Sequence, residues 1–322
     1  MISIAMCTYN GEKYIKEQLE SIINQTLQPE EIVICDDCSS DCTIKIIKNV
    51  MSKWSGQWRL VCNKNNLGYR KNFQQAIGLC HGDFIFLSDQ DDVWDREKLE
   101  IEYPYFKDKS VILVFHDAEV VDEKLQQISP SFWNDLRFKY TAFEKGDYSR
   151  LLRANLIQGA SCGFRRELFK LCHPPFPEDA IHDEWLGINA AFLGKIVPIH
   201  RQLLKYRQTG NNQIGAKQDG LKEKIGSWIK DFSQKAQKHN SYLQHQERLW
   251  KIFAERYPDG YLGVTNAQEY YKFLLHRIEA ISEHRFGPLP SLHEYKHMLN
   301  DSMEAKRQYV KDRLLILQLR RK

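Results

Sequence analysis

Three carboxylates that follow an apolar stretch could hold a divalent cation. Residues 84–87, Phe-Ile-Phe-Leu, have the pattern of a buried strand, and Asp89, Asp91 and Asp92 come directly after it. Two carboxylates at the end of a strand can hold one hard cation such as Mg²⁺ or Mn²⁺, and that cation can bridge two phosphate oxygens. The pair Asp89 and Asp91 therefore predicts a metal site for a diphosphate ligand.

This acidic stretch allows two other interpretations. A calcium-binding EF-hand loop needs an oxygen ligand at its fifth position and glycine at its sixth, but counting from Asp89 gives Val93 and Trp94. An ordinary solvated acidic turn would explain any single Asp-x-Asp pair. The other polar loops of the same predicted sheet, described below, favour the metal site.

A second group of ionisable residues opens a predicted helix at residues 183–193. His182, Asp183 and Glu184 stand at its amino-terminal end, where the helix dipole stabilises a carboxylate. The spacing His-x-Glu also occurs in zinc deaminases, but their Pro-Cys-x-x-Cys pattern is absent, and so is His-Glu-x-x-His. From the residues alone, these carboxylates either have a chemical role or simply face the dipole.

Two tryptophans flank the acidic motifs. Trp94 follows the first motif and Trp185 follows the second. Aromatic faces stack well on the apolar side of a sugar, although core packing explains buried tryptophans equally well. Together with His182 and Glu184, the two tryptophans are the candidates for contacts with an acceptor.

The elements that position these motifs form a predicted open α/β sheet. Strands are predicted at residues 2–7, 31–35, 60–62 and 84–87, with helices at 43–53 and 73–80 and a further helix capped by Asn10. In such sheets, ligands bind outside the carboxyl ends of the strands. Three polar loops leave these ends, at residues 8–10, 36–41 and 88–92.

The pattern changes twice further along the chain. From about residue 110 it is mixed, with strands predicted at 111–115, 118–121, 159–164, 196–199 and 203–206. After residue 215 the sequence is charged and helical in period, with helices predicted within 220–256, 267–284 and 292–319. We expect an α/β domain at 1–215, with halves of about 1–110 and 111–215, and a helical subdomain at 216–322.

Composition excludes several classes of protein. The net charge of +4 and the lack of a nucleic-acid motif argue against RNA or DNA as a partner. The sequence has no apolar run of 18 residues and no signal-peptide pattern at its start. Cys35-x-x-Cys38 lacks a second ligand pair for zinc, so the eight cysteines are expected to be free thiols in a reducing cytosol. The expected location is cytoplasmic.

The usual phosphate-binding loops are missing, because no GxGxxG follows the first strand and no GxxxxGK[ST] occurs anywhere. The stretches CTYNGEKYIKEQLESIINQTLQPEEIVICDDCSSDCT and FLSDQDDVW instead resemble the family 2 inverting glycosyltransferases with the GT-A fold. The bacterial polysaccharide rhamnosyltransferase-like branch is the most similar. The resemblance covers about residues 1–215, and its motifs are specific together rather than singly.

The resemblance implies a role for particular residues. In that family a nucleotide-diphosphate sugar lies across the carboxyl edge of the sheet. The implied nucleotide contacts are Thr8, Tyr9, Asn10 and Glu12, with Asp37 on the base, Asp89 and Asp91 on ribose and metal, Lys71 or Arg70 on the diphosphate, and Asp183 as the general base. For Lys71 and Arg70, a solvated helix start is an equal alternative. Arg207 is a further candidate, since a guanidinium group suits a phosphate.

Two departures from the family pattern stand out. Cys38 occupies a position that is usually glycine in the second loop, so the turn there is expected to be strained or reshaped. Thr209 stands where relatives usually have a histidine that helps to hold the metal or the diphosphate. His200 could replace that third ligand, or it could simply be a surface residue.

The sequence thus predicts a metal-dependent inverting glycosyltransferase that uses Mn²⁺ or Mg²⁺. Its donor would be dTDP-rhamnose or a UDP-hexose, and its acceptor a glycan or a lipid-linked saccharide in bacterial surface polysaccharide synthesis. A sugar nucleotidyltransferase and a non-catalytic sugar-nucleotide-binding module are the alternatives. The last helix carries Leu314, Leu315, Leu317 and Leu319 among basic residues. It could dock on the catalytic domain, pair two subunits or lie peripherally on an anionic membrane.

Overall fold

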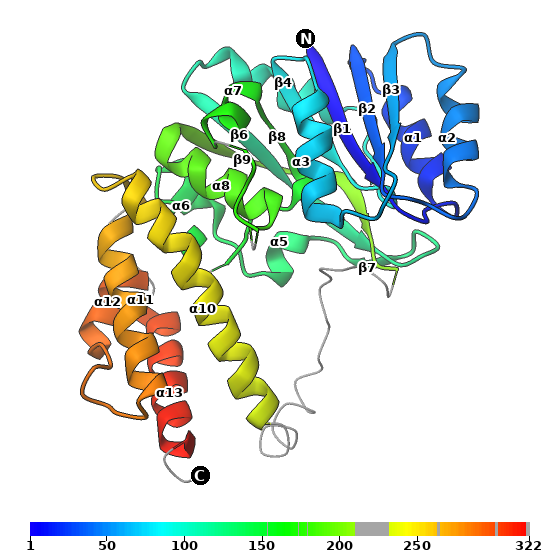
Figure 1. The fold of residues 1–322 in the computed structure, drawn as a ribbon. Coiled ribbons are helices and arrows are strands. Elements are labelled where there is room, and N and C mark those ends of the chain that lie inside the picture. The colour runs from blue at the N-terminus through cyan, green and yellow to red at the C-terminus, as the bar shows by residue number, and fades with distance from the viewer. Residues whose placement is uncertain are drawn as a thin grey trace. The chain divides into compact units, whose positions relative to one another are not determined.

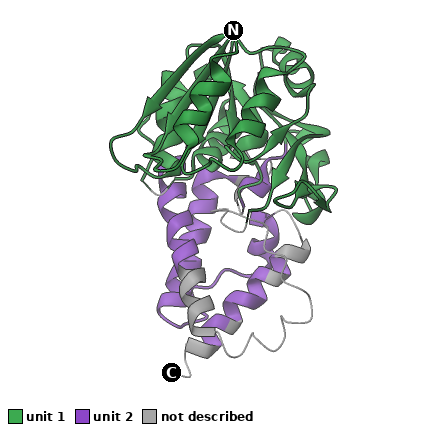
Figure 2. Cartoon of the chain, turned by 90° about the vertical axis from the view of Figure 1, so that its right-hand side faces the viewer, with its two compact units in different colours: residues 1–146, 155–213 green, residues 147–154, 214–322 purple. Residues whose placement is uncertain are grey.

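The computed structural model describes residues 1–152, 154–172, 174–178, 180–209, 232–262, 265–299 and 302–319. The chain divides into two compact units (Figure 2). The first contains Met1–Gly146 and Asn155–Gln213, and the second contains Asp147–Ala154 and Ile214–Lys322. The domain boundary predicted near residue 215 lies outside the described residues, and so does the start of the helix predicted from residue 220. That the short stretch 147–154 belongs to the second unit was not predicted.

The first unit is an α/β structure built on one mixed sheet (Figure 1). Its strands are β1 (Ile2–Thr8), β2 (Glu31–Asp36), β3 (Gln57–Cys62), β4 (Phe84–Ser88), β5 (Val93–Trp94), β6 (Val111–Val121), β7 (Gln127–Ser129), β8 (Cys162–Arg165) and β9 (Lys195–Arg207). Their order in the sheet is β3-β2-β1-β4-β8-β6-β9-β5, and β7 pairs with β6. The predicted α/β class is confirmed.

Helices connect these strands. They are α1 (Ile15–Ile23), α2 (Thr43–Met51), α3 (Tyr69–Leu79), α4 (Lys98–Glu102), α5 (Phe132–Asp135), α6 (Tyr140–Glu144), α7 (Arg166–Leu171) and α8 (His182–Leu193), with 3₁₀ turns at Tyr103–Lys107 and Gly159–Ser161. The helix α3 packs on β1 and β2, and α1 packs on α2 and β5.

The central strands explain why the sheet forms and where its loops meet. Every residue of β1 and of β2 is buried, as expected for strands covered on both faces. The strand β1 runs parallel to both β2 and β4, with Thr8 opposite Asp36 and Met6 opposite Ser88. The three loops that follow these strands therefore leave the sheet at the same edge.

Two predicted strand pairs are single long strands. The segments 111–115 and 118–121 form β6, and the segments 196–199 and 203–206 form β9. The register between β6 and β9 shifts where Ile199 faces His116 and Gln202 faces Asp117, so a β-bulge lies where the predicted segments are separated. The result is one strand, β9, that pairs with β6 and reaches β5 at the edge of the sheet.

Asn10 does not cap α1, so that prediction is wrong. The helix begins at Ile15 after Tyr14, with no side-chain cap. Asn10 instead has a φ of 47°, and its Oδ1 accepts a hydrogen bond of 2.9 Å from the backbone N–H of Ser40. The side chain therefore joins two loops at the edge of the sheet, a partner too distant in the sequence for a capping pattern to reveal.

The second unit is mainly helical, as predicted. Its elements are a 3₁₀ turn at Ser149–Leu152, α10 (Phe232–Arg256), the short pair β10 (Tyr261–Leu262) and β11 (Thr265–Asn266), α11 (Ala267–Ser282), α12 (Leu292–Leu299) and α13 (Ser302–Leu319). The single helix predicted at 292–319 is therefore two helices. Among the described residues, no helix is both long and apolar enough to cross a membrane.

A buried ion pair joins three helices of this unit. Arg277 on α11 donates to Asp312 on α13 at 2.7 Å, and the hydroxyl of Tyr295 on α12 donates to the same carboxylate at 2.5 Å. Leu315 on α13 is buried whereas Leu317 is exposed. The last helix thus uses part of its leucine-rich stretch to pack within its own unit, and its predicted contact with a membrane or a second subunit stays a prediction.

Candidate active site

The loops after β1, β2 and β4 are joined to one another by side-chain hydrogen bonds. The Gln90 side chain accepts from the backbone N–H of Tyr9 at 2.8 Å and donates to the backbone oxygen of Tyr9 at 3.0 Å. The hydroxyl of Thr8 donates to Asp36 at 2.8 Å. These contacts hold the first loop against the second loop and against the acidic motif, so the three loops form one surface.

The residues predicted to line a nucleotide pocket differ in how exposed their side chains are and in whether those side chains already hold other loops. The Tyr9 side chain is 49% exposed and available for stacking, whereas Thr8 is buried. Glu12 accepts a hydrogen bond from the backbone N–H of Cys42 at 2.9 Å, so its carboxylate braces the second loop. Asn10 and Glu12 are exposed too, but both side chains hold the second loop, so Tyr9 is the side chain that we expect to stack on a ligand.

Asp37 organises the loop that precedes α3. Its carboxylate accepts from the Asn63 side chain at 2.9 Å and from the backbone N–H groups of Leu67 and Gly68, each at 2.8 Å. Asp37 is also buried. The structure therefore gives this carboxylate a bracing role, and its contact with a nucleotide base stays a prediction.

Cys38 adopts the backbone conformation that its position in the sequence suggested. Its φ is 71°, in the left-handed region that glycine occupies without steric cost. Any L-residue with a Cβ atom is strained there, by roughly 1–2 kcal/mol. The turn keeps its shape despite the substitution of the usual glycine, at a cost to stability.

We expect Cys38→Gly to raise the free energy of unfolding by about 0.5–1 kcal/mol. Relief of the left-handed strain exceeds the additional entropy that glycine gains in the unfolded chain. Urea denaturation of the purified protein measures the change. Cys38→Ala is the matched control, since it removes the thiol but keeps Cβ, and equal stabilisation by both variants would contradict the explanation.

The acidic motif concentrates negative charge. Burial, repulsion from Asp91 and repulsion from Asp183 raise the pKa of Asp89 to about 7. Burial also raises the pKa of Asp91 and that of Asp92, and one carboxylate oxygen of Asp92 has no hydrogen-bond partner among the described residues. A divalent cation would relieve this repulsion.

The donor set suits such a cation. Carboxylate oxygens are the hard ligands that Mg²⁺ and Mn²⁺ prefer, and one or two carboxylates plus substrate phosphates often suffice to hold Mg²⁺. The described residues contain no group of three His, Cys, Asp or Glu side chains placed to hold a metal. Asp89 and Asp91 are the residues that would hold the ion, beside a diphosphate.

Asp183 lies at the start of α8 and is held by three hydrogen bonds. Its Oδ1 accepts from the Asn155 side chain at 2.7 Å and from the backbone N–H of Glu184 at 2.8 Å, while Oδ2 accepts from the Gly159 N–H at 2.9 Å. A Cβ atom at position 159 would lie 2.9 Å from the ring of His182, so only glycine fits there without a shift. These contacts fix the carboxylate in one orientation.

The neighbours of Asp183 are buried as well. The His182 ring stacks on Phe73 with 4.1 Å between the ring centroids, and its Nδ1 finds no hydrogen-bond partner in the described part of the chain. Burial lowers the pKa of His182, so its imidazole is neutral at pH 7. Glu184 is also buried. The acceptor contacts predicted for these two residues stay predictions.

The two tryptophans are buried, which favours core packing, the alternative to the predicted stacking on an acceptor. Trp94 is 3% exposed, and Trp185 is 1% exposed. The ammonium group of Lys98 lies 4.7 Å from the ring centre of Trp94, and the indole N–H of Trp185 donates to the backbone oxygen of Cys172. Neither ring presents a face to a ligand.

The basic residues predicted to contact the diphosphate or the metal lie in different surroundings. Lys71 is exposed, and Arg70 donates to the backbone oxygen of Glu178 at 3.1 Å. His200 pairs with Glu144 at 3.3 Å, which favours the surface role over the third metal ligand. The guanidinium group of Arg207 donates to acceptors of the protein itself, which gives it a bracing role, and its contact with a phosphate stays a prediction.

Sequence reasoning missed three residues of this site. Gln90 lies inside the acidic motif, but its contact with Tyr9 depends on the pairing of β1 with β4. Asn155 and Gly159 hold Asp183 across a gap of more than twenty positions in the chain. No local sequence pattern marks Asn155 or Gly159. The expectation of a general base at Asp183 is the one signal that could have suggested hydrogen-bond donors for its carboxylate.

Comparison with known protein families and sequences gives a consistent result. The family described as Glycosyl transferase family 2 matches residues 3–171. A dTDP-rhamnosyl transferase, RfbG of Shigella flexneri, is 33% identical over 225 residues, which cover 66% of this chain and 74% of that protein. WfgD of Escherichia coli, described as a UDP-Glc:alpha-D-GlcNAc-diphosphoundecaprenol beta-1,3-glucosyltransferase, is 26% identical and covered to 69%. The match to a Mycobacterium tuberculosis protein, Rv1520, is 27% identical and spans 58% of the length of that relative.

Solved structures share the fold. Staphylococcus aureus TarS (residues 1–349) in complex with UDP superposes with a TM-score of 0.59 at 15% identity, covering 99% of this chain and 91% of that one. The mannosyltransferase PcManGT of Pyrobaculum calidifontis, in complex with GDP-Man and Mn²⁺, gives a TM-score of 0.53 at 15% identity, covering 96% and 75%. At these identities the likeness establishes the fold alone.

Proposed function

The chain belongs to glycosyl transferase family 2, and from that membership we propose that it is an inverting enzyme that uses a nucleotide-diphosphate sugar and a divalent cation. The acceptor would be a glycan or a lipid-linked saccharide of a bacterial surface polysaccharide. The observation that carries the proposal is the proximity of two carboxylate groups, the acidic motif after β4 and Asp183 at the start of α8. Asp89 lies close enough to Asp91 and to Asp183 for both to raise its pKa.

The two groups suit two separate tasks. Asp89 and Asp91 would hold a cation, which when bound neutralises the charge that develops on the leaving diphosphate. Asp183, fixed by Asn155 and Gly159, would take the proton from the attacking acceptor hydroxyl. Attack from the face opposite the leaving group inverts the anomeric configuration of the sugar.

The nucleotide would lie on the first two loops. Tyr9 offers an exposed ring for stacking, and Asp37 stands in the second loop, where the family resemblance places the base contact. The similarity to RfbG favours dTDP-rhamnose as donor, and the similarity to WfgD favours UDP-glucose. We propose these two sugars as the first to test.

A thermal-shift series with dTDP-rhamnose, UDP-glucose and other sugar nucleotides, with and without Mn²⁺, tests the function. A donor at about 100 times its dissociation constant should stabilise the protein by about 2.7 kcal/mol. Release of the nucleoside diphosphate in the presence of an acceptor would support transfer. Release of pyrophosphate would instead identify a nucleotidyltransferase, and binding without turnover of any donor would identify a binding module.

A further inference from the structure

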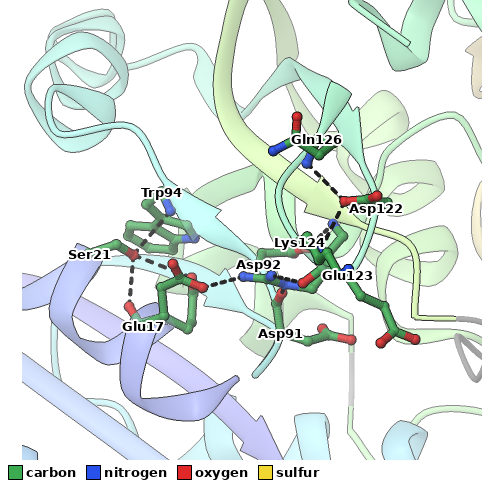
Figure 3. Close-up of polar contacts among 11 residues, drawn as sticks. Glu17, Ser21, Asp91, Asp92, Trp94, Asp122, Glu123, Lys124 and Gln126 are labelled. Carbon is green, nitrogen blue, oxygen red and sulfur yellow. Dashed lines mark hydrogen bonds and ion pairs between the residues drawn. The ribbon is translucent and has the colours of Figure 1, made fainter. Parts of the chain in front are cut away.

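Arg207, the last residue of β9, lies where several segments of the first unit meet. Its side chain is only 2% exposed. Figure 3 shows three of its partners, Glu17, Asp91 and Glu123, in one cluster. The guanidinium group donates through Nε to the backbone oxygen of Asp91 at 2.7 Å, through Nη1 to the backbone oxygen of Glu123 at 2.7 Å, and through Nη2 to the Glu17 carboxylate at 2.5 Å.

These partners come from three separate parts of the chain. Glu17 lies on α1, which follows the first loop, Asp91 belongs to the acidic motif, and Glu123 lies in the turn after β6. The guanidinium group also lies 4.7 Å from the ring centre of Tyr14. The planar guanidinium group has five N–H donors and can donate to three acceptors in different directions at once, whereas the ammonium group of a lysine acts as a single point charge.

The guanidinium group of Arg207 contacts the acidic motif through the backbone of Asp91 and leaves the Asp91 carboxylate free for another partner. Arg207 Nε binds the carbonyl oxygen of Asp91, and the backbone N–H of Arg207 donates to a carboxylate oxygen of the buried Asp92 at 3.1 Å. The Asp91 side chain is therefore held in place through its own main chain. The fixed positive charge of Arg207 also offsets part of the repulsion within the motif.

We propose that Arg207 is a positioning residue for the metal-binding carboxylate of Asp91, and that Glu17 orients Arg207 in turn. The inference rests on the proposed function, because it assumes that Asp89 and Asp91 hold a divalent cation. It replaces a direct contact between Arg207 and phosphate. Outer partners of this kind typically contribute 10–100-fold to metal affinity.

Binding of Mn²⁺ alone, followed through the electron paramagnetic resonance signal of the free ion, tests the proposal without a turnover assay. Arg207→Lys keeps the charge but loses the fork, and it should weaken Mn²⁺ binding by about 10-fold or more. Glu17→Gln should weaken it in the same direction by a smaller factor. Glu17 is 49% exposed, so this second variant is expected to fold even if a change of the buried arginine impairs folding.

Glu20→Gln is the matched control. Glu20 lies on the same helix and, within the part of the chain that the structure describes, its carboxylate pairs with Lys16 alone, at 3.9 Å on the surface, so its loss should leave Mn²⁺ affinity unchanged. Wild-type Mn²⁺ affinity in both Glu17→Gln and a folded Arg207→Lys protein would overturn the proposal. So would weaker binding of UDP in the absence of metal together with unchanged Mn²⁺ affinity, because that result would identify a direct phosphate contact.

The outcome for the wild-type protein separates this inference from the proposed function. If the wild-type protein binds Mn²⁺ and transfers sugar while the variants bind Mn²⁺ equally well, the positioning role alone fails. If the wild-type protein neither binds Mn²⁺ nor turns over any donor, the proposed function fails, and the inference fails with it.

Discussion

Asp183→Asn is expected to lower kcat by about 10²–10⁴-fold, the usual contribution of general-base catalysis. An amide has nearly the size of a carboxylate but cannot accept the proton of the acceptor hydroxyl. Its oxygen can still accept from Asn155, although its NH₂ group would face the Gly159 N–H and lose one hydrogen bond. Donor affinity should be almost unchanged, because the nucleotide would lie on other loops.

Steady-state kinetics with a fixed acceptor, together with donor titration, measures both quantities. Glu167→Gln is a suitable control, because Glu167 is an exposed carboxylate in the first turn of α7. Like Asp183 it lies at the amino-terminal end of a helix, but it has no proposed role in the site. The control should transfer sugar at the wild-type rate. A wild-type kcat in Asp183→Asn, or a product that keeps the anomeric configuration of the donor, would show that the assigned role is wrong.

Loss of the metal ligand should have an effect of comparable size. We expect Asp91→Ala to reduce transfer to the background level and to weaken binding of the sugar nucleotide. Without that carboxylate, the cation would keep Asp89 as its remaining protein ligand beside the diphosphate. Treatment of the wild-type protein with EDTA should give the same loss, and added Mn²⁺ should restore activity to the treated wild type but not to the variant.

Asp83→Ala controls for a general effect of removing a carboxylate. The Asp83 side chain is exposed and pairs with the amino terminus at 3.2 Å, a surface contact worth about 0–1 kcal/mol at most. Its loss should leave transfer unchanged. Full activity in a thoroughly chelated wild-type sample would exclude a role for the metal, whatever the behaviour of Asp91→Ala.

The parts of the fold that depend on local pattern could be predicted from the sequence. The strands β1, β2 and β4 are short apolar runs followed by polar loops, and their parallel pairing brings those loops together. Cys38 was identified as strained because its position is usually glycine, and its φ of 71° agrees. Such features are properties of a few adjacent residues, which is why the chain itself reveals them.

The features that sequence reasoning did not find depend on contacts between distant residues. Stacking on a sugar and packing in a core can use the same residue type, so the sequence cannot separate these two roles for Trp94. The burial of its side chain favours the core. A phosphate contact is expected for Arg207 because a guanidinium group suits a phosphate, but its acceptors in the structure include two backbone oxygens. Backbone acceptors carry no sequence signature, so only the folded chain could show them.

The long strand β9 also affects the order in which parts of the sheet can form during synthesis. The short strand β5, directly after the acidic motif, pairs with the last part of β9, where Val93 faces Lys205 and Trp94 faces Leu204. During synthesis, a ribosome delivers β5 more than a hundred residues before its partner. The sheet around β1, β2 and β4 can form before β9 is synthesised, whereas β5, directly after the acidic motif, has no strand to pair with until then. The nascent chain would therefore complete its predicted cation site late, and a chain that ends before residue 207 would lack the strand that pairs with β5 beside that site.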